Sequence, residues 1–186
     1  MTRGSLVSLL LLLGSLGCGG EGDPLVVTRT PIRINELASR NNAYGDLGNG
    51  YGDWIELYNA ADEDFDLDGC FISDSMKKRF KDSFVAGTIV PAGGVLLVWA
   101  DGSTDPITAR EPHLSFRLST AGEGVWLSNP AGYVVDSVEF GTLPEQSLDT
   151  DRTSLARFPD GSGGFAWCSA WSPEELNGDA CAGAAP

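Results

Sequence analysis

Residues 52–102 have the sequence GDWIELYNAADEDFDLDGCFISDSMKKRFKDSFVAGTIVPAGGVLLVWADG, and this stretch decides the fold. Apolar and polar side chains alternate along residues 53–59, as they do in a β-strand with one buried face. Acidic turns follow, and then Pro-Ala-Gly-Gly at 91–94, where proline fixes φ and glycine permits positive φ. The apolar run at 95–100 is typical of a strand buried on both faces. The pattern indicates strands joined by tight turns.

The rest of the chain repeats this alternation of short strands and turns. Strands are expected at residues 32–37, 53–59, 65–72, 95–100, 113–118, 124–128, 133–140, 153–158 and 165–168. The third of them is expected to have a local bend or bulge at Asp68 and Gly69. Residues 39–52 are too polar and glycine-rich for a strand, and residues 76–85 favour a strand or loop, although Phe80 and Phe84 have helical spacing. Roughly nine strands with regular turns predict an all-β antiparallel sandwich or barrel. Long helical patterns, which would indicate a parallel sheet, are absent from the sequence.

Several short motifs occur in the order in which one known family has them. They are INEL (34–37), DWIELYN (53–59), DLDG (66–69), ISD (72–74), IVPAGG (89–94), LVWA (97–100), FRLS (116–119), VDSV (135–138) and RFPDG (157–161). In this order they resemble the lamin-tail domain. The resemblance implies an immunoglobulin-like antiparallel β-sandwich that serves attachment or interaction, and it offers no catalytic motif. Cys70 departs from the pattern, because relatives often carry an aromatic residue there.

The N-terminus resembles a bacterial lipoprotein signal. Arg3 supplies a positive charge, residues 6–13 are an apolar run too short to span a bilayer, and small residues precede Cys18. Ser15 departs from the usual motif, which has leucine there. We expect residues 1–17 to be the signal peptide and Cys18 to be lipidated, with ordinary secretory cleavage nearby as the alternative. Several acyl chains would anchor the protein stably at ~0.8 kcal/mol per buried methylene.

The segments after this signal differ in composition. Residues 18–30 are polar, contain glycine and proline, and predict a flexible tether. Residues 31–180 are expected to form one β-sandwich domain, and residues 181–186 a C-terminal tail. Gly19, rather than aspartate, follows Cys18, and by the same resemblance this favours the outer membrane or the cell surface of a bacterium.

The chain is strongly acidic, with 12 Lys and Arg against 26 Asp and Glu and a formal net charge of −14. Such a surface repels phosphate backbones, and the charge therefore argues against a nucleic-acid partner. The one basic patch consists of Lys77, Lys78, Arg79 and Lys81. This patch either docks an acidic partner or lipid headgroups, or protects an edge strand against aggregation.

Three cysteines follow Cys18. Export places the chain in an oxidising compartment, where a disulfide is plausible. Cys168 and Cys181 flank a loop rich in turn-forming residues, and this pair is favoured; Cys70–Cys168 is the alternative. If Cys168 pairs with Cys181, Cys70 is expected to be a small buried apolar residue. The spacings do not fit a zinc or redox motif, and no cofactor is expected.

Catalytic candidates are few. His113 is the only histidine, stands next to Pro112, and has no nucleophile motif near it. Glu36, Asp53 and Glu56 are the candidates from which a glycosidase carboxylate pair would be drawn, but the sequence does not fix the distances between them. The sequence therefore names no catalytic residue.

Two further groups are candidates for binding. Asp62, Asp64 and Asp66, with Glu63 and Asp68 beside them, are weak calcium candidates, but the EF-hand spacing is absent and turns favour the same residues. Most tryptophans of a small sandwich serve its core. Trp54 and Trp126 lie opposite the more aliphatic face of their strands and are the candidates for ligand-facing aromatic residues.

Together these features predict a non-enzymatic module on the bacterial envelope that mediates protein–protein binding or surface attachment. Its partner is expected to be an envelope protein or a polysaccharide. A carbohydrate-binding surface module is the first alternative, which exposed Trp54 or Trp126 would support. A small envelope hydrolase is the second, and it would need carboxylates converging in a cleft around His113 or Glu56.

Overall fold

The computed structural model describes residues 30–46, 50–144, 152–178 and 181. The expected signal peptide, Cys18 and nearly all of the expected tether lie outside these residues. In the part of the chain that is described, no helix is long and apolar enough to cross a membrane.

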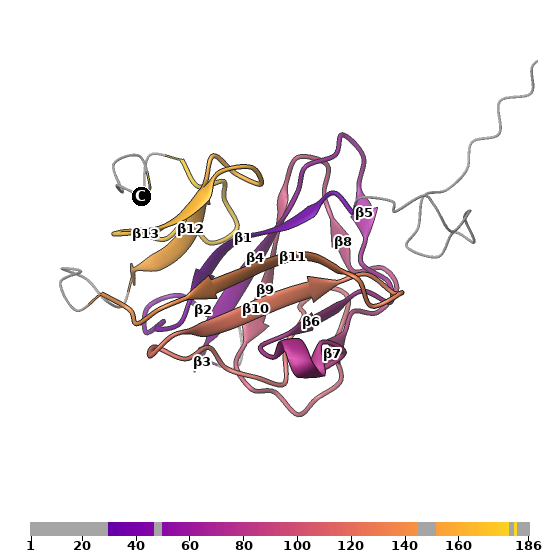
Figure 1. The fold of residues 1–186 in the computed structure, drawn as a ribbon, viewed down its shortest axis with the longest axis horizontal. Helices are drawn as coiled ribbons and strands as arrows, with labels where there is room; N and C mark the ends of the chain where they lie inside the picture. Colours follow the sequence, from indigo (N-terminus) through magenta and orange to yellow (C-terminus); the bar gives the residue numbers. More distant parts are fainter. Residues whose placement is uncertain (1–29, 47–49, 145–151, 179–180, 182–186) are drawn as a thin grey trace, which may run out of the picture.

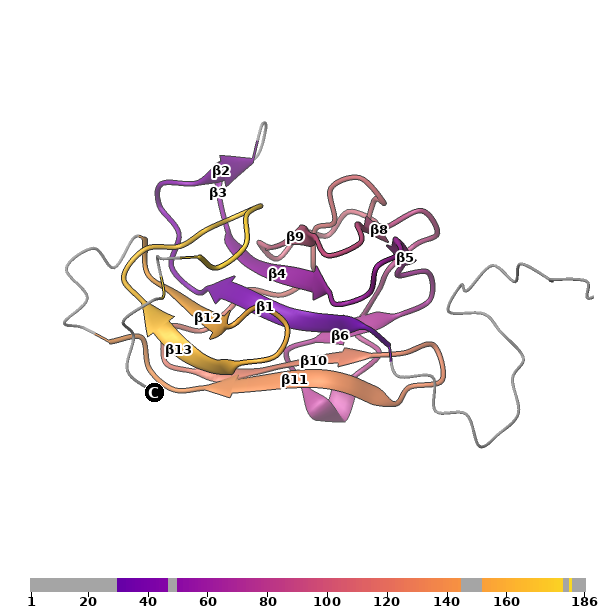
Figure 2. The same ribbon diagram turned by 90° about the horizontal axis from the view of Figure 1, so that it is seen from above.

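Two antiparallel sheets face each other and form a β-sandwich (Figures 1 and 2). The five-stranded sheet has the order β13 (Gly164–Cys168), β12 (Ser154–Phe158), β1 (Ile32–Ala38), β4 (Asp53–Asn59) and β9 (Val95–Ala100). The four-stranded sheet has the order β11 (Val134–Phe140), β10 (Glu123–Ser128), β6 (Phe71–Ser73) and β7 (Asp82–Ser83). The expected all-β, immunoglobulin-like sandwich is confirmed.

Smaller elements complete the fold. β2 (Gly45–Asp46) pairs with β3 (Gly50–Tyr51), and β5 (Phe65–Asp66) pairs with β8 (Ile89–Val90). A short 3-10 turn, η1 (Met76–Lys78), follows β6. The loop expected at residues 39–52 therefore contains a short strand pair, which its glycine-rich composition did not indicate.

The hydrophobic core fills the space between the two sheets. Alternate positions of β4 and β10 face it, so that Ile55 and Leu57 on one sheet meet Val125 and Leu127 on the other within one buried cluster. Each fully buried aliphatic side chain of this kind contributes about 1.5–3 kcal/mol relative to exposure. The alternation in residues 53–59 therefore identified the core-facing side chains of β4 correctly.

Residues 113–118 alternate as expected but do not form a ladder. Leu114, Phe116 and Leu118 are buried, whereas the strand-type pairing of the segment is limited to isolated bridges at His113 and Arg117. Carboxylates replace strand partners along it: Asp82 Oδ2 accepts from the Ser115 amide at 3.1 Å and Asp53 Oδ2 from the Leu118 amide at 2.9 Å. The expectation of a strand here was wrong because these contacts come from distant residues.

The strand expected at residues 65–72 is divided between two sheets. Gly69, with φ of 69°, turns the chain between β5 and β6. Residues 76–85, expected as a strand or loop, contain η1 and then the short β7. The chain thus leaves the small β5–β8 sheet and enters the four-stranded sheet within a few residues.

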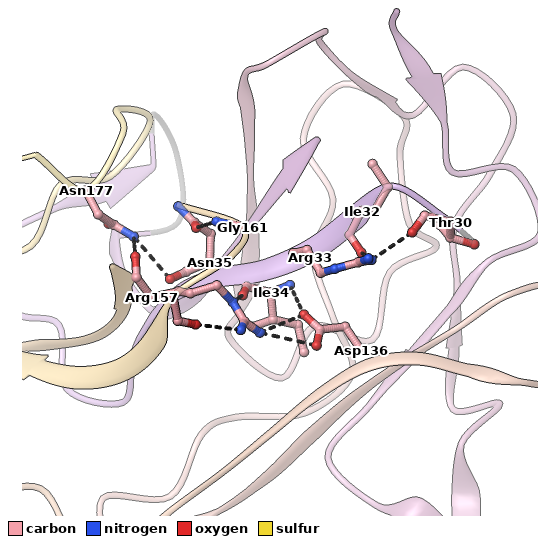
Figure 3. Close-up of polar contacts among 10 residues, drawn as sticks. Thr30, Ile32, Arg33, Ile34, Asn35, Asp136, Arg157, Gly161 and Asn177 are labelled. Carbon is pink, nitrogen blue, oxygen red and sulfur yellow. Dashed lines mark hydrogen bonds and ion pairs between the residues drawn. The ribbon is translucent and has the colours of Figure 1, made fainter. Parts of the chain in front are cut away.

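A polar seam joins the two sheets along one side of the sandwich (Figure 3). Asp136 on β11 accepts the backbone N–H of Ile34 on β1 at 2.8 Å, and Arg157 Nε on β12 donates to the Ile34 carbonyl at 3.0 Å. Arg157 and Asp136 also form an ion pair at 2.9 Å, with 13% and 15% of their respective side-chain surfaces exposed. Backbone groups of Ile34, where β1 departs from regular pairing, are thereby satisfied.

Candidate functional site

The two most buried carboxylates lie side by side on the five-stranded sheet. A β-bulge between Ile34 and Glu36 shifts the register of β1, so that Glu36 pairs directly with Glu56 on β4. Leu37 and Ile55, the next pair, belong to the core, and the two glutamates therefore point to the opposite face. Like charges directly opposite each other in a sheet are destabilising, so this pair requires a compensating environment.

A segment near the C-terminus, the strap (residues 171–177), covers these carboxylates. It lies on the side of the five-stranded sheet that faces away from β10 and β11 (Figure 2). The Ser172 amide and hydroxyl donate to Glu36, the hydroxyl at 2.9 Å, and the Glu174 amide donates to Glu56 Oε2 at 2.8 Å. The Ser154 hydroxyl also donates to Glu36. Backbone and hydroxyl donors thus bind both acids.

Further bonds hold the middle of the strap and its C-terminal end. Asn177 is fully buried, and its side-chain amide donates to the carbonyls of Asn35 and Arg157 at 3.2 and 3.0 Å (Figure 3). The Tyr44 hydroxyl donates to Glu174 Oε2 at 2.6 Å. Glu174 has φ of 65°, a conformation that residues other than glycine rarely adopt, and these contacts maintain it.

Burial changes the charge state of the pair. Desolvation, followed by the neighbouring Glu36 charge, raises the pKa of Glu56 to about 9. Desolvation also raises the pKa of Glu36, against hydrogen bonds from Ser154 and Ser172 that lower it. At neutral pH Glu56 is therefore protonated, and the site carries at most the single charge of Glu36.

This geometry does not suit hydrolysis. Neither carboxylate is exposed, and both oxygens of Glu36 accept bonds from serines. Glu56 Oε1 has no hydrogen-bond partner among the described residues, but the strap separates it from solvent. Asp53, the third carboxylate considered, binds the Leu118 amide, and burial raises its pKa to about 6. The carboxylates considered as a glycosidase pair instead fasten loops to the sheet.

Trp54 was expected among the ligand-facing aromatic residues, and this expectation was wrong. Its side chain is fully buried in a second cluster with Ala38, Leu97 and Trp99. Trp171 of the strap packs over it, with ring centroids 6.2 Å apart. The strap makes this face a second buried layer, and the sequence of β4 alone carries no sign of it.

His113 is part of a stacked group at the edge of the sheet. Its Nδ1 lies 2.8 Å from Asp101 Oδ2, and its ring stacks on Trp99, which in turn stacks on Tyr44. Asp101 also accepts the Ser103 amide at 3.1 Å. The histidine thus helps to hold the loop after β9.

The acidic turn residues bind backbone rather than converging on one point. Asp64 accepts the Ala92 amide at 2.9 Å, whereas Asp66 accepts the amides of Asp68 and Gly87. Asp62 is exposed. Among the described residues no group of three or more His, Cys, Asp or Glu side chains is arranged to hold a metal ion. The acids therefore fix turns, and their geometry does not support a calcium site.

This interpretation makes a prediction for Asp66→Ala. Losing charge-assisted bonds to two amides should lower the free energy of unfolding by about 1.5–3 kcal/mol. The loss should be equal with calcium or with a chelator, as measured by thermal unfolding. The exposed Asp62→Ala is the matched control and should stay within about 0.5 kcal/mol of wild type. A calcium-dependent rise in Tm of the wild type that Asp66→Ala abolishes would restore the calcium interpretation.

The structure joins Cys168 to Cys181, the pair favoured from the sequence, and keeps Cys70 as a buried thiol. The bridge links the end of β13 to the chain beyond the strap across a sequence separation of 13. It therefore encloses the strap in a closed loop.

Removing this bridge should loosen the strap. We expect Cys168→Ser/Cys181→Ser to lower the free energy of unfolding by about 3 kcal/mol. The reason is that a bridge closing a loop of this length restricts the unfolded chain, and its removal returns that conformational entropy. Hydrogen exchange of the amides of Ser172 and Glu174 should accelerate. Reduction of the wild type should reproduce both effects, and unchanged exchange in the variant would show that the strap is held without the bridge.

The opposite sheet presents a different surface, the lysine surface (residues 76–81). It holds Lys77, Lys78 and Lys81, which are the only lysines in the sequence, together with Arg79. Met76 and Phe80 are exposed to 48% and 52%. Phe80 stands edge-on to Phe71 of β6 at 4.9 Å. Cationic and apolar side chains therefore gather on one part of an otherwise acidic molecule.

Trp126 lies on β10 of the same sheet. It is half-buried and alternates with the core residues Val125 and Leu127, and it therefore points away from the core. A Cβ on Gly124 would lie 2.3 Å from the indole ring, which shows that the ring folds over this glycine. The structure thus keeps Trp126, but not Trp54, as a partly exposed aromatic residue.

Sequence reasoning missed the residues that organise the carboxylate pair. Ser172 and Asn177 lie in a segment without strand or helix periodicity. Asn35, next to Glu36, binds Asp160 across 125 positions of the sequence, a contact that no local pattern indicates. The only local signal was the run of turn-forming residues between Cys168 and Cys181.

Comparison with known proteins gives one family. A family model described as Lamin Tail Domain matches residues 27–142, well over half of the chain. The matched range ends before β12, and the polar seam's Arg157 and the strap lie beyond it. No curated protein matches the chain significantly.

Proposed function

The chain belongs to the Lamin Tail Domain family of immunoglobulin-like, non-catalytic domains, and from this premise we propose that it is a binding module of the bacterial envelope rather than an enzyme. Its partner is an envelope protein or polysaccharide, and its role is attachment or scaffolding.

One observation carries this proposal: the four side chains considered for acid–base chemistry, all of which the structure describes, are committed to the fold. Glu36 and Glu56 bind the strap, Asp53 binds the Leu118 amide, and His113 contacts Asp101. An active site needs such groups at a solvent-accessible cleft. The lysine surface, by contrast, is exposed.

The location follows from the N-terminal sequence. The short apolar run and the small residues before Cys18 support export and lipidation. A lipid at Cys18 would leave the polar residues up to Thr30 as a tether between the membrane and β1. The module would then remain at the envelope while its surfaces face partners.

Metabolic labelling tests the location. Bacteria producing the full chain or Cys18→Ser would be fed a clickable fatty acid and fractionated. We expect label and membrane association in the wild type, and neither in Cys18→Ser. A wild-type chain that is unlabelled and soluble would reject the lipid anchor and favour ordinary secretory cleavage.

Glu56→Gln tests the enzyme alternative. A glycosidase working through the carboxylate pair would lose its activity in this variant. We expect no hydrolysis of envelope polysaccharide by the wild type. Hydrolysis that Glu56→Gln removes would overturn the binding-module proposal.

A further inference from the structure

We propose that the lysine surface, with Trp126 beside it, binds an anionic polysaccharide. This inference rests on the proposed function, because it names the partner class of the binding module. Negative groups of the polymer pair with Lys77 and Lys78, and its sugar rings pack on the exposed aromatic faces.

Charge placement is the first argument. The formal net charge of the chain is −14, yet every lysine lies within residues 77–81. Lys81 pairs with Asp74 at 2.7 Å. Lys77 and Lys78 are exposed, and neither forms an ion pair with another residue that the structure describes. Arg79 adds a further positive charge. The lysine surface therefore carries an excess of positive charge, which complements an anionic ligand.

The shape of the surface is the second argument. Lys78, Phe80 and Lys81 line a shallow hollow of about 320 Å³. The exposed Phe80 ring offers an apolar contact to a sugar ring, and the neighbouring lysines offer charge pairing to its carboxylate or sulfate.

Preorganisation of the aromatic side chains is the third argument. Phe80 is held by its edge-on contact with Phe71 and by the Arg79 guanidinium 4.8 Å above its ring. Arg79 is itself fixed, because its Nε donates to the Gly132 carbonyl at 2.9 Å. Little side-chain freedom remains to be lost when a ligand binds.

Trp126 extends the same surface along the sheet. Trp126 pairs with Ser73, and Phe71 pairs with Ser128 two residues further on. Two residues along a strand span roughly 7 Å. Aromatic side chains at successive positions along the sheet suit a polymer better than a single small anion.

The distribution of negative charge distinguishes a polymer from a membrane. Glu139 lies on β11 opposite Gly124, and Asp74 lies beside Lys81. A flat anionic bilayer pressed on this surface would also meet these acids, whereas a narrow chain can follow the cations and aromatic rings. The surface therefore fits a polyuronate or sulfated glycan better than lipid headgroups.

Affinity electrophoresis of the purified full chain tests the inference, with polygalacturonate as the probe and neutral dextran as its control. We expect retardation by polygalacturonate only, weakening as salt rises because the exposed cations are screened. Lys77→Gln/Lys78→Gln should bind at least tenfold more weakly, and Phe80→Ala should also be weakened. Arg110→Gln, an exposed cation outside this surface, should bind as wild type.

Two results would overturn the inference. The first is no retardation of the wild type at low salt. The second is equal retardation of the wild type and Lys77→Gln/Lys78→Gln, with circular dichroism showing that both are folded. Binding of polyglutamate without polygalacturonate would assign the surface to an acidic protein, which rejects the glycan but leaves the binding-module proposal intact.

Discussion

Replacing Arg157 with methionine should be the most damaging single change to this fold. Its guanidinium pairs with Asp136, donates to the Ile34 and Gly163 carbonyls, and lies 4.3 Å above the Phe165 ring. Arg157→Met leaves the Asp136 carboxylate mostly buried without its counter-ion. Removing one partner of a buried pair costs about 3–5 kcal/mol. Chemical denaturation measures this loss.

A double-mutant cycle keeps the prediction testable if Arg157→Met folds poorly. Asp136→Asn removes the stranded charge, and the double variant should be less destabilised than the sum of the single variants. A coupling of about 2 kcal/mol is expected for such a contacting pair. The exposed Arg110→Met is the control and should change stability by less than about 0.5 kcal/mol. A loss below about 1 kcal/mol in Arg157→Met would show that the seam contributes little.

Glu56→Gln should stabilise the protein at alkaline pH. The raised pKa of about 9 means that the native state retains a proton that the unfolded chain, at its ordinary 4.5, has lost. Between pH 4.5 and pH 9, folding therefore takes up a proton. The stabilisation that protonated Glu56 contributes is fully present below about pH 4.5 and is lost as the pH rises towards 9. The wild type should lose roughly 1.4 kcal/mol per pH unit in this window.

The glutamine side chain of this variant imitates the protonated acid and should remove most of this slope. At pH 8, which lies about 3.5 units above the ordinary value of 4.5, we expect the variant to be more stable by on the order of 5 kcal/mol. Measurements between pH 7 and 9 exclude the contribution of Asp53, whose pKa of about 6 lies below that range. Glu139→Gln is the control and should keep the wild-type slope. Equal slopes in wild type and Glu56→Gln would mean that Glu56 is ionised in the native state.

The core was predictable from local alternation, because Ile55, Leu57 and their neighbours repeat with the period of a strand. The glycine and proline turns were equally visible. The polar seam was not, since Asp136 binds the Ile34 amide across 102 residues and no local rule links them. The same holds for the carboxylates that satisfy amides in residues 113–118.

The strap covers the outer face of the five-stranded sheet, and this explains why the sequence misplaced both the glutamates and Trp54. In a strand with one buried face, Glu56 and Trp54 occupy the face normally left to solvent, and the sequence therefore suggested accessible acids and an outward tryptophan. The strap buries both, and its own residues have no periodic signal.

Zero-length carbodiimide crosslinking in native cells tests the central claim, that this chain works by binding through its lysine surface. The reagent joins a contacting carboxylate to an amine, and the only lysine amines are at residues 77–81. Because Lys77→Arg/Lys78→Arg/Lys81→Arg keeps the charge but removes these amines, we predict a high-mass adduct in the wild type that this variant lacks. An equal adduct in both would contradict the claim.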